Sequence, residues 1–251
     1  MSGFGLIVIG DEVLSGQVQD QHVPSTITLL KEYSQSLKWV RYVGDEFEPL
    51  VAVLKDSFAS GDTVLVTGGI GATPDDRTRL AAATALGLEL QPHADGVAIL
   101  NEKYGDDIYP NRIQLVSFPE GAELIPNPVN RIPGFSIAGH HFVPGFPRMA
   151  GPMLAWVMQQ YYADRPPSLL LEKHMKVFNS YESQFTPLLE QLESDYPHIN
   201  TFSLPSTKEG EPWVDLGVKG ADGAELEKAC EWLHSELLRF DGVVVEVFEN
   251  K

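Results

Sequence analysis

The sequence predicts an α/β protein in which a three-layer α/β/α domain with a mostly parallel sheet precedes a small α+β domain. Apolar strand-like runs alternate with segments of helical apolar spacing through the first two thirds of the chain, an order typical of parallel sheets covered by helices on both faces. This alternation stops at the stretch Ala163 to Pro167, which contains two prolines. A length of 251 residues suffices for two cores. We therefore expect domains at residues 1–165 and 166–251.

The first domain is predicted from the period of its apolar residues. Continuous apolar runs of four to eight residues indicate buried strands, and apolar residues three or four apart indicate helices. Prolines and glycines make residues 119–134 rich in loops. We expect strands at 4–9, 39–43, 63–66, 135–138 and 141–143, and helices at 25–36, 46–58, 80–86, 94–104 and 148–162.

The second domain has a shorter pattern of strands and helices in mixed order. We expect strands at 169–177, 199–204, 212–218 and 243–247, and helices at 181–192 and 223–238. This order favours a sheet with its helices on one face.

A glycine-rich loop is the most informative feature of the first domain. It reads TGGIGATPDDRT from Thr67 to Thr78 and lies between a predicted strand and a predicted helix. Glycines allow backbone N–H groups to approach a ligand, and a helix N-terminus favours phosphate. The spacing matches neither a Walker loop nor a dinucleotide-binding loop. Because Asp75 and Asp76 would repel a phosphate unless a hard cation lies between them, the loop predicts a metal and a phosphorylated ligand together. The alternative is a tight turn capped by an aspartate.

Polar residues also follow the first two predicted strands. The first is followed by Asp11, Glu12, Ser15, Gly16 and Asp20, and the second by Asp45. Ligands of parallel α/β sheets bind beyond the carboxyl ends of the strands, so these residues are expected to meet the glycine loop at one rim. Taken singly, each carboxylate also fits a helix cap or a solvated turn.

Charge and composition limit the partners. The formal net charge of -17 is shared almost evenly by the parts before and after Pro166, so neither has the basic surface that nucleic acids require. No apolar run is long enough to span a bilayer, and no leader pattern precedes the first strand. The single cysteine, Cys230, indicates a reduced, cytoplasmic protein. We expect no nucleic-acid and no membrane partner.

Several motifs in a fixed order resemble the MogA/MoaB family of molybdopterin-binding domains, and more closely the N-terminal domain of the competence/damage-inducible CinA proteins. The matching segments are GDEVLSG at 10–16, VGD at 43–45, the glycine loop at 67–78, NP at 127–128 and PGFP at 144–147. The likeness covers about residues 4–162. The second domain resembles the KH-like domain of CinA through NSYES at 179–183, although it lacks the Gly-x-x-Gly loop with which KH domains hold nucleic acids. The C-terminal amidase domain of many CinA proteins has no counterpart in this sequence, so deamidation of nicotinamide mononucleotide is not implied.

The resemblance implies two alternative functions. One is metal-dependent hydrolysis of the pyrophosphate of ADP-ribose or FAD, with Mg²⁺, Mn²⁺ or Co²⁺ and possibly K⁺. The other is capture of molybdopterin in cofactor biosynthesis without hydrolysis. Relatives form dimers or trimers, so we expect a homo-oligomer that binds a small phosphorylated nucleotide or pterin.

The expected site combines these arguments, with Asp45 and Asp76 as the functional pair of the family. We assign catalysis to Asp45 and Asp76 and metal binding to Asp45, Asp75 and Asp76. Ligand binding is assigned to Asp11, Glu12, Ser15, Gly16, Asp20, Thr67, Gly68, Gly69, Ile70, Gly71, Thr73, Asn127, Pro144 and Gly145.

Departures from the family pattern affect this site. Ala72 replaces a usual proline, Asn130-Arg131-Ile132 replaces a Gly-x-Ala, and Met149 replaces an acidic residue. They imply a changed second ligand loop, with a different ligand or lost turnover.

Overall fold

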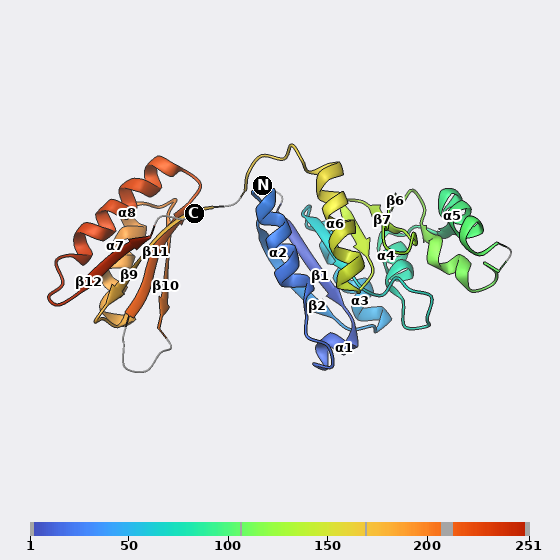
Figure 1. Ribbon diagram of the computed structural model, residues 1–251, viewed down its shortest axis with the longest axis horizontal. Coiled ribbons are helices and arrows are strands. Elements are labelled where there is room, and N and C mark those ends of the chain that lie inside the picture. Colours follow the sequence, from blue (N-terminus) through green and yellow to red (C-terminus); the bar gives the residue numbers. More distant parts are fainter. Residues whose placement is uncertain (1–2, 106, 169, 207–212, 249–251) are drawn as a thin grey trace. The chain divides into compact units, whose positions relative to one another are not determined.

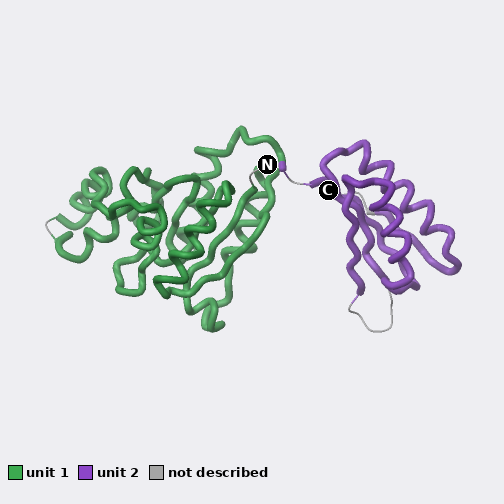
Figure 2. Tube along the Cα trace, turned by 180° about the vertical axis from the view of Figure 1, so that it is seen from behind, with its two compact units in different colours: residues 1–167 green, residues 168–251 purple. Residues whose placement is uncertain are grey.

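The computed structural model describes residues 3–105, 107–168, 170–206 and 213–248. The chain forms two compact units, residues 1–167 and 168–251 (Figure 2). Leu169 and Pro212, with which two predicted strands begin, lie outside the described residues. No helix in the described part has both the length and the apolar character needed to cross a membrane.

The first unit is built on a six-stranded sheet in the order β2-β1-β3-β8-β7-β6. Its strands are β1 (Phe4–Ile9), β2 (Leu37–Val43), β3 (Thr63–Thr67), β6 (Glu123–Ile125), β7 (Gly134–Ile137) and β8 (His140–Val143). Strands β2, β1, β3 and β8 are parallel, whereas β7 and β6 continue the sheet antiparallel. The carboxyl ends of the four parallel strands therefore lie at one edge, as the mostly parallel prediction requires.

Helices cover both faces of this sheet (Figure 1). On one face lie α3 (Phe47–Ala59), α4 (Thr78–Leu86) and α5 (Ala94–Tyr104), and on the other lie α2 (His22–Glu32) and α6 (Pro147–Tyr161). Successive side chains of a strand point to opposite faces, so Ile7 joins the first of these cores and Leu6 the second. This alternation makes the predicted α/β/α sandwich.

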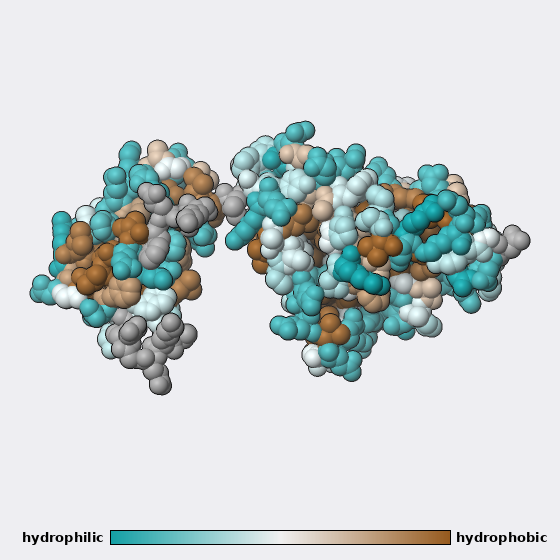
Figure 3. Space-filling view, in the orientation of Figure 1, coloured by the Kyte–Doolittle hydropathy of each residue, from teal (hydrophilic) through white to brown (hydrophobic). Residues whose placement is uncertain are grey.

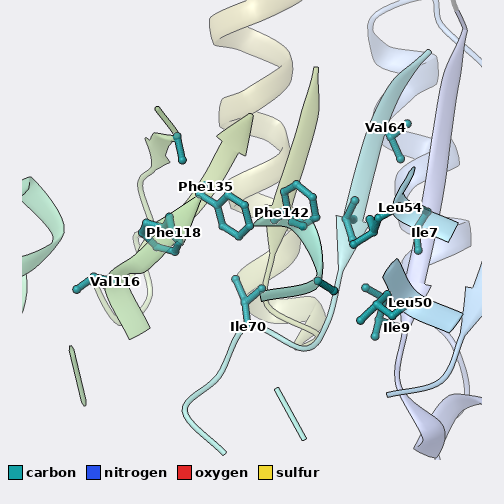
Figure 4. Packing of buried hydrophobic residues seen from close by; sticks show 14 of the residues in the cluster. Ile7, Ile9, Leu50, Leu54, Val64, Ile70, Val116, Phe118, Phe135 and Phe142 are labelled. Atoms are coloured by element: carbon teal, nitrogen blue, oxygen red, sulfur yellow. The ribbon is translucent and has the colours of Figure 1, made fainter. Parts of the chain in front are cut away.

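Three stacked aromatic rings extend the core toward the short strands β4 (Leu90–Pro92) and β5 (Ser117–Pro119). The ring centroids of Phe118 and Phe135 lie 4.9 Å apart, and those of Phe135 and Phe142 lie 4.3 Å apart (Figure 4). The strands β4, β5 and β6, the helix α1 (Asp11–Leu14) and the 3₁₀ helix η1 (Arg112–Val116) were not predicted, because each is short and none contains a continuous apolar run of four or more residues.

The second unit has a four-stranded antiparallel sheet in the order β10-β11-β9-β12. It comprises β9 (Leu171–Phe178), β10 (Asn200–Pro205), β11 (Trp213–Gly220), β12 (Val244–Phe248), the helices α7 (Thr186–Asp195) and α8 (Gly223–Leu237), and the 3₁₀ helix η2 (Glu182–Gln184). Helix residues Leu192 and Leu233 share one core with strand residues Val177 and Leu216, so both helices lie on the same face. The predicted helix at 181–192 is split, and α7 starts where Pro187 stands in the first turn, a position at which proline loses no hydrogen bond.

Candidate functional site

A cavity of about 580 Å³ lies at the carboxyl ends of the parallel strands in the first unit. It is lined by Ile9, Gly10, Glu12, Asp45, Gly68, Gly69, Ile70, Gly71, Ala72, Thr73, Asp75, Asp76, Leu115, Asn130, Ile132, Pro144, Gly145, Phe146 and Met149. The structure thus brings together residues that follow β1, β2, β3 and β8. Its volume is within the range of small-molecule sites.

The glycine loop is held against the end of the sheet. Gly68 has a φ of 103°, and a Cβ there would lie 2.1 Å from the carbonyl oxygen of Ile9. Its N–H group donates to the Val143 carbonyl at 3.0 Å, and the Thr78 hydroxyl donates to its carbonyl at 3.1 Å. Only glycine meets both the conformation and the close approach.

Asp76 is engaged with its own loop. Its carboxylate accepts hydrogen bonds from the N–H groups of Gly71, at 2.7 Å, and Thr73, at 3.0 Å, and from the Thr73 hydroxyl. The same hydroxyl lowers the pKa of the neighbouring Asp75. Within the described residues, the N–H groups of Gly69 and Ile70 have no such partner. The amides of Gly69 and Ile70 are therefore available to a ligand, while Asp76 shapes the loop that presents them.

Arg79 is a site residue that the sequence analysis missed. Its guanidinium is 4% exposed and donates to the carbonyl oxygens of Ile70 and Gly71. Burial lowers its pKa to about 10, against the opposing effect of the Asp76 charge. A basic residue in the first turn of a helix is unfavourable for the helix dipole, and that mismatch was the available signal.

Asp45 lies at the centre of a group of carboxylates. The Asp11 N–H group donates to Asp45 Oδ2 at 2.9 Å, and the Asp45 N–H group donates to Asp11 Oδ1 at 3.3 Å. Burial raises the pKa of Asp45, and the negative charges of Asp11, Glu12 and Asp75 raise it further, although the hydrogen bond from Asp11 opposes them. This position is one at which a cation would be stabilised.

The carboxylates do not form a complete metal site by themselves. Among the residues that the structure describes, no three His, Cys, Asp or Glu side chains are grouped so that they could hold a metal ion. Mg²⁺, however, is usually bound by one or two carboxylates together with phosphate oxygens and water. Asp45 and Asp75 both line the cavity and interact electrostatically, so the donor set fits a cation that arrives with a phosphorylated ligand.

Six of the residues assigned to ligand binding are not in the cavity wall: Asp11, Ser15, Gly16, Asp20, Thr67 and Asn127. Asp20 accepts the N–H groups of His22 and Val23 at the start of α2 and the Tyr42 hydroxyl, which is the alternative capping role of such a residue. Thr67 is fully buried at the end of β3. Ser15 and Gly16 are exposed outside the cavity.

The segment from Asn127 to Ile132 contributes Asn130 and Ile132 to the cavity wall. Asn127 is buried, and its Oδ1 accepts the N–H groups of Val129 and Asn130. Asn130 Oδ1 in turn accepts the Ile132 N–H group at 2.9 Å. Asn130 therefore builds a turn in place of the glycine of the family pattern, and it lines the cavity together with Met149. Arg131, an alternative phosphate ligand by charge, pairs with Glu102 instead.

Comparison with known proteins agrees with this architecture. Residues 5–164 match the sequence model of a family described as "Probable molybdopterin binding domain". The chain belongs to this family. The molybdopterin-binding domain thus covers the sheet, the glycine loop and the cavity of the first unit.

Relatives of the molybdopterin-binding domain protein include CinA-like proteins. A protein of Pyrobaculum arsenaticum is 30% identical over 237 residues, which is 90% of this chain and 89% of that relative. A CinA-like protein of Anaeromyxobacter dehalogenans is 34% identical over 135 residues, but these cover 53% of this chain and 33% of the relative. The crystal structure of CinA from Thermoplasma acidophilum, described as a protein of unknown function, superposes with a TM-score of 0.58 at 25% identity, covering 63% of this chain and 96% of that one. The first unit is thus a MogA-like domain of CinA type.

Proposed function

We propose that the first unit binds a diphosphate-containing nucleotide or pterin together with a divalent cation, and hydrolyses a nucleotide of the ADP-ribose or FAD class at the diphosphate. One observation carries this proposal. The cavity joins the unpaired amides of Gly69 and Ile70 to the carboxylates of Asp45 and Asp75, and no Lys, Arg or His is among the residues that line it. Because the wall carries no cationic side chain, an anionic ligand must be neutralised by a cation that it brings.

In this proposal, backbone amides bind the phosphate and carboxylates bind the cation. The amides of Gly69 and Ile70 bind phosphate oxygens, and Arg79 and Asp76 hold these amides in position. Asp45 and Asp75 hold the cation. A bound Mg²⁺, Mn²⁺ or Co²⁺ supplies charge neutralisation at a phosphoryl oxygen and lowers the pKa of a water. Glu12, also in the wall, adds negative charge that favours the cation.

The raised pKa of Asp45 gives the site a pH dependence. The cation binds the ionised carboxylate, so protonation of Asp45 competes with metal binding. Ligand affinity is expected to fall as the pH is lowered through the raised pKa of Asp45. The same burial and neighbouring charges destabilise the ionised side chain in the ligand-free protein, so Asp45→Asn is not expected to weaken the fold.

Asp45→Asn is the test of this proposal. Purified protein is incubated with ADP-ribose or FAD and with Mg²⁺, Mn²⁺ or Co²⁺, and AMP is measured by chromatography. We expect at least a hundredfold loss of AMP formation, with an unfolding midpoint in urea no lower than that of the wild type. Asp56→Asn, an exposed change on α3, is the control and should retain activity. Undiminished AMP formation in Asp45→Asn contradicts the proposed mechanism.

Capture without hydrolysis is the second function, and one observation favours it. Met149 lines the cavity where the family pattern carries an acidic residue, so the site has one carboxylate fewer for a cation or a water. A carrier would bind a pterin or nucleotide with the same loops and release it unchanged. Cation-dependent binding that is lost in Asp45→Asn, with no AMP formed by the wild type, assigns this function in place of hydrolysis.

A further inference from the structure

Phe146 is an exposed aromatic residue on the wall of the cavity. Phe146 is 62% exposed. In the chain it stands between the buried strand β8 and the helix α6, which has a buried face. An exposed phenyl ring gains nothing from the core and loses the free energy of apolar burial. Packing in the core therefore does not explain why this side chain lies next to the glycine loop.

The backbone that carries Phe146 is fixed. Its carbonyl oxygen accepts the N–H groups of Met149, at 2.8 Å, and Ala150, at 2.9 Å, as the first bonds of α6. Pro147 follows and favours the extended conformation seen at Phe146, with φ -95° and ψ 113°. The Cα of Phe146 is therefore held in one place beside the cavity, and its ring is not packed into the core.

Gly145, the residue before Phe146, is in contact with His22 and with the glycine loop. The Gly145 carbonyl accepts a hydrogen bond from His22 Nε2 at 3.0 Å. A Cβ on Gly145 would lie 3.2 Å from Gly68 Cα, so the backbones of the two loops are in close contact. Phe146 is one residue away from this contact and hence adjacent to the amides proposed to bind phosphate.

The remainder of the cavity wall has two different parts. Glu12, Asp45 and Asp75 supply charge beside the glycine loop, whereas Leu115, Ile132 and Met149 supply apolar surface. The volume of about 580 Å³ leaves room for more than a diphosphate group. A wall of this kind suits a ligand with a charged end and an apolar end.

We infer that Phe146 is the platform on which the planar heterocycle of the ligand stacks while its diphosphate binds the glycine loop. This inference rests on the proposed function and adds the residue that selects ring-bearing ligands over simple phosphates. Purines, flavins and pterins all present a flat π-face, and stacking on an aromatic side chain accepts each of them. Inorganic diphosphate lacks that face and is predicted to bind more weakly.

The test compares two probes that share one charged group. Titration calorimetry of the full chain with Mg²⁺ measures the Kd of α,β-methylene-ADP, which resists hydrolysis, and of methylenediphosphonate, which has no ring. We expect Phe146→Ala to raise the Kd of the nucleotide about tenfold, as truncation of a base-stacking aromatic does. The Kd of methylenediphosphonate should change less than twofold, and Phe146→Tyr should retain wild-type affinity for both.

A matched control and a second ring complete the design. Leu204, 60% exposed in the second unit, is changed to alanine and should leave both constants unaltered. The Kd of 6-hydroxymethylpterin diphosphate, compared with that of α,β-methylene-ADP, shows whether a pterin is preferred to adenine. Phe146→Ala should raise this Kd by a similar factor.

The outcomes separate this inference from the proposed function. If the wild type binds methylenediphosphonate as tightly as either ring-bearing probe, or if Phe146→Ala weakens all probes equally, Phe146 is no stacking platform, yet the metal and phosphate site stands. If no probe binds in the presence of Mg²⁺, both the platform and the proposed function are overturned.

Discussion

Arg79 and Asp76 bind the backbone of the same loop with opposite charges. The guanidinium donates hydrogen bonds to the carbonyl oxygens of Ile70 and Gly71, and the carboxylate accepts hydrogen bonds from the N–H groups of Gly71 and Thr73. Hydrogen bonds to charged groups contribute about 1.5–3 kcal/mol each. With a pKa of about 10, Arg79 is charged at neutral pH. The loop geometry is thus set by two side chains that need not touch the ligand.

Removal of Arg79 should weaken both the fold and the site. Arg79→Met leaves two carbonyl groups unpaired in a buried place and is expected to lower the free energy of unfolding by about 2–4 kcal/mol, with at least tenfold weaker binding of α,β-methylene-ADP and Mg²⁺. Urea unfolding and calorimetry measure the two effects. The control is Arg77→Met, because Arg77 is exposed and donates to the Pro74 carbonyl at 3.3 Å. Equal effects of the two changes would show that Arg79 has no special role.

At the scale of elements, two of the loops that line the cavity are in close contact. One follows β3 and contains Gly68, and the other joins β8 to α6 and contains Gly145. Each loop supplies a part of the cavity wall: Gly69 and Ile70, whose amides are proposed to bind phosphate, belong to the first loop, and Phe146 belongs to the second. Their separation is determined by the absence of a side chain at Gly145.

A methyl group at Gly145 should push the two loops apart. Gly145→Ala is expected to weaken nucleotide binding about three- to tenfold and to lower the free energy of unfolding by about 1 kcal/mol, as slight overpacking does. Gly151→Ala, in the middle of α6, meets nothing within 4 Å and should stabilise the protein by about 0.5–1 kcal/mol without changing the affinity. Unaltered binding in Gly145→Ala would argue against the importance of the loop contact.

At the scale of the whole molecule, the stability of the first unit depends on two neutral histidines in β8. His140 Nε2 bonds to the Ser57 hydroxyl at 2.9 Å, and the two nitrogens of His141 bond to the hydroxyls of Ser136 and Tyr162 at 2.8 and 2.7 Å. Burial lowers the pKa of each histidine from 6.5 to about 4, and the neighbouring His140 adds to the shift at His141. Both side chains are saturated with structural partners.

These shifts predict acid unfolding of the first unit. Between pH 6.5 and about 4 the unfolded chain binds more protons than the folded one, so stability falls as the pH falls through this window. Each histidine accounts for at most about 3 kcal/mol, and together they approach the total stability of an ordinary domain. Urea unfolding at a series of pH values measures the loss, and ¹H NMR of the imidazoles should show both neutral down to pH 5. Titration of either near pH 6.5 would contradict the prediction.

Hydrophilic side chains cover much of the visible face of the first unit (Figure 3). A net charge of -17 repels free anionic ligands at long range. Binding of a phosphorylated ligand as its cation complex reduces this repulsion, which is consistent with the carboxylates at the site.

Much of the fold could be predicted because its signals are local. The helix at 94–104 and the strands at 4–9 and 63–66 were predicted within one residue of their observed ends, since apolar period and strand length are written in consecutive residues. The parallel order follows from the alternation of strands and helices. The segment Glu123–Ile125 was missed because it is three residues long and lies among prolines and glycines, where the sequence favours a loop.

The sequence by itself determined the sheet, its helical layers and the convergence of Asp45, Asp75 and the glycine loop, since the ends of parallel strands must share an edge. The tertiary structure alone decided what these residues do there. Asp76 accepts hydrogen bonds from its own loop, and buried Arg79 donates to two carbonyl groups of that loop. Asp20 caps the start of a helix, and Phe146 is exposed. These roles depend on which backbone groups each side chain contacts after folding and on how much of it is exposed to water. The spacing of residues in the sequence does not specify either.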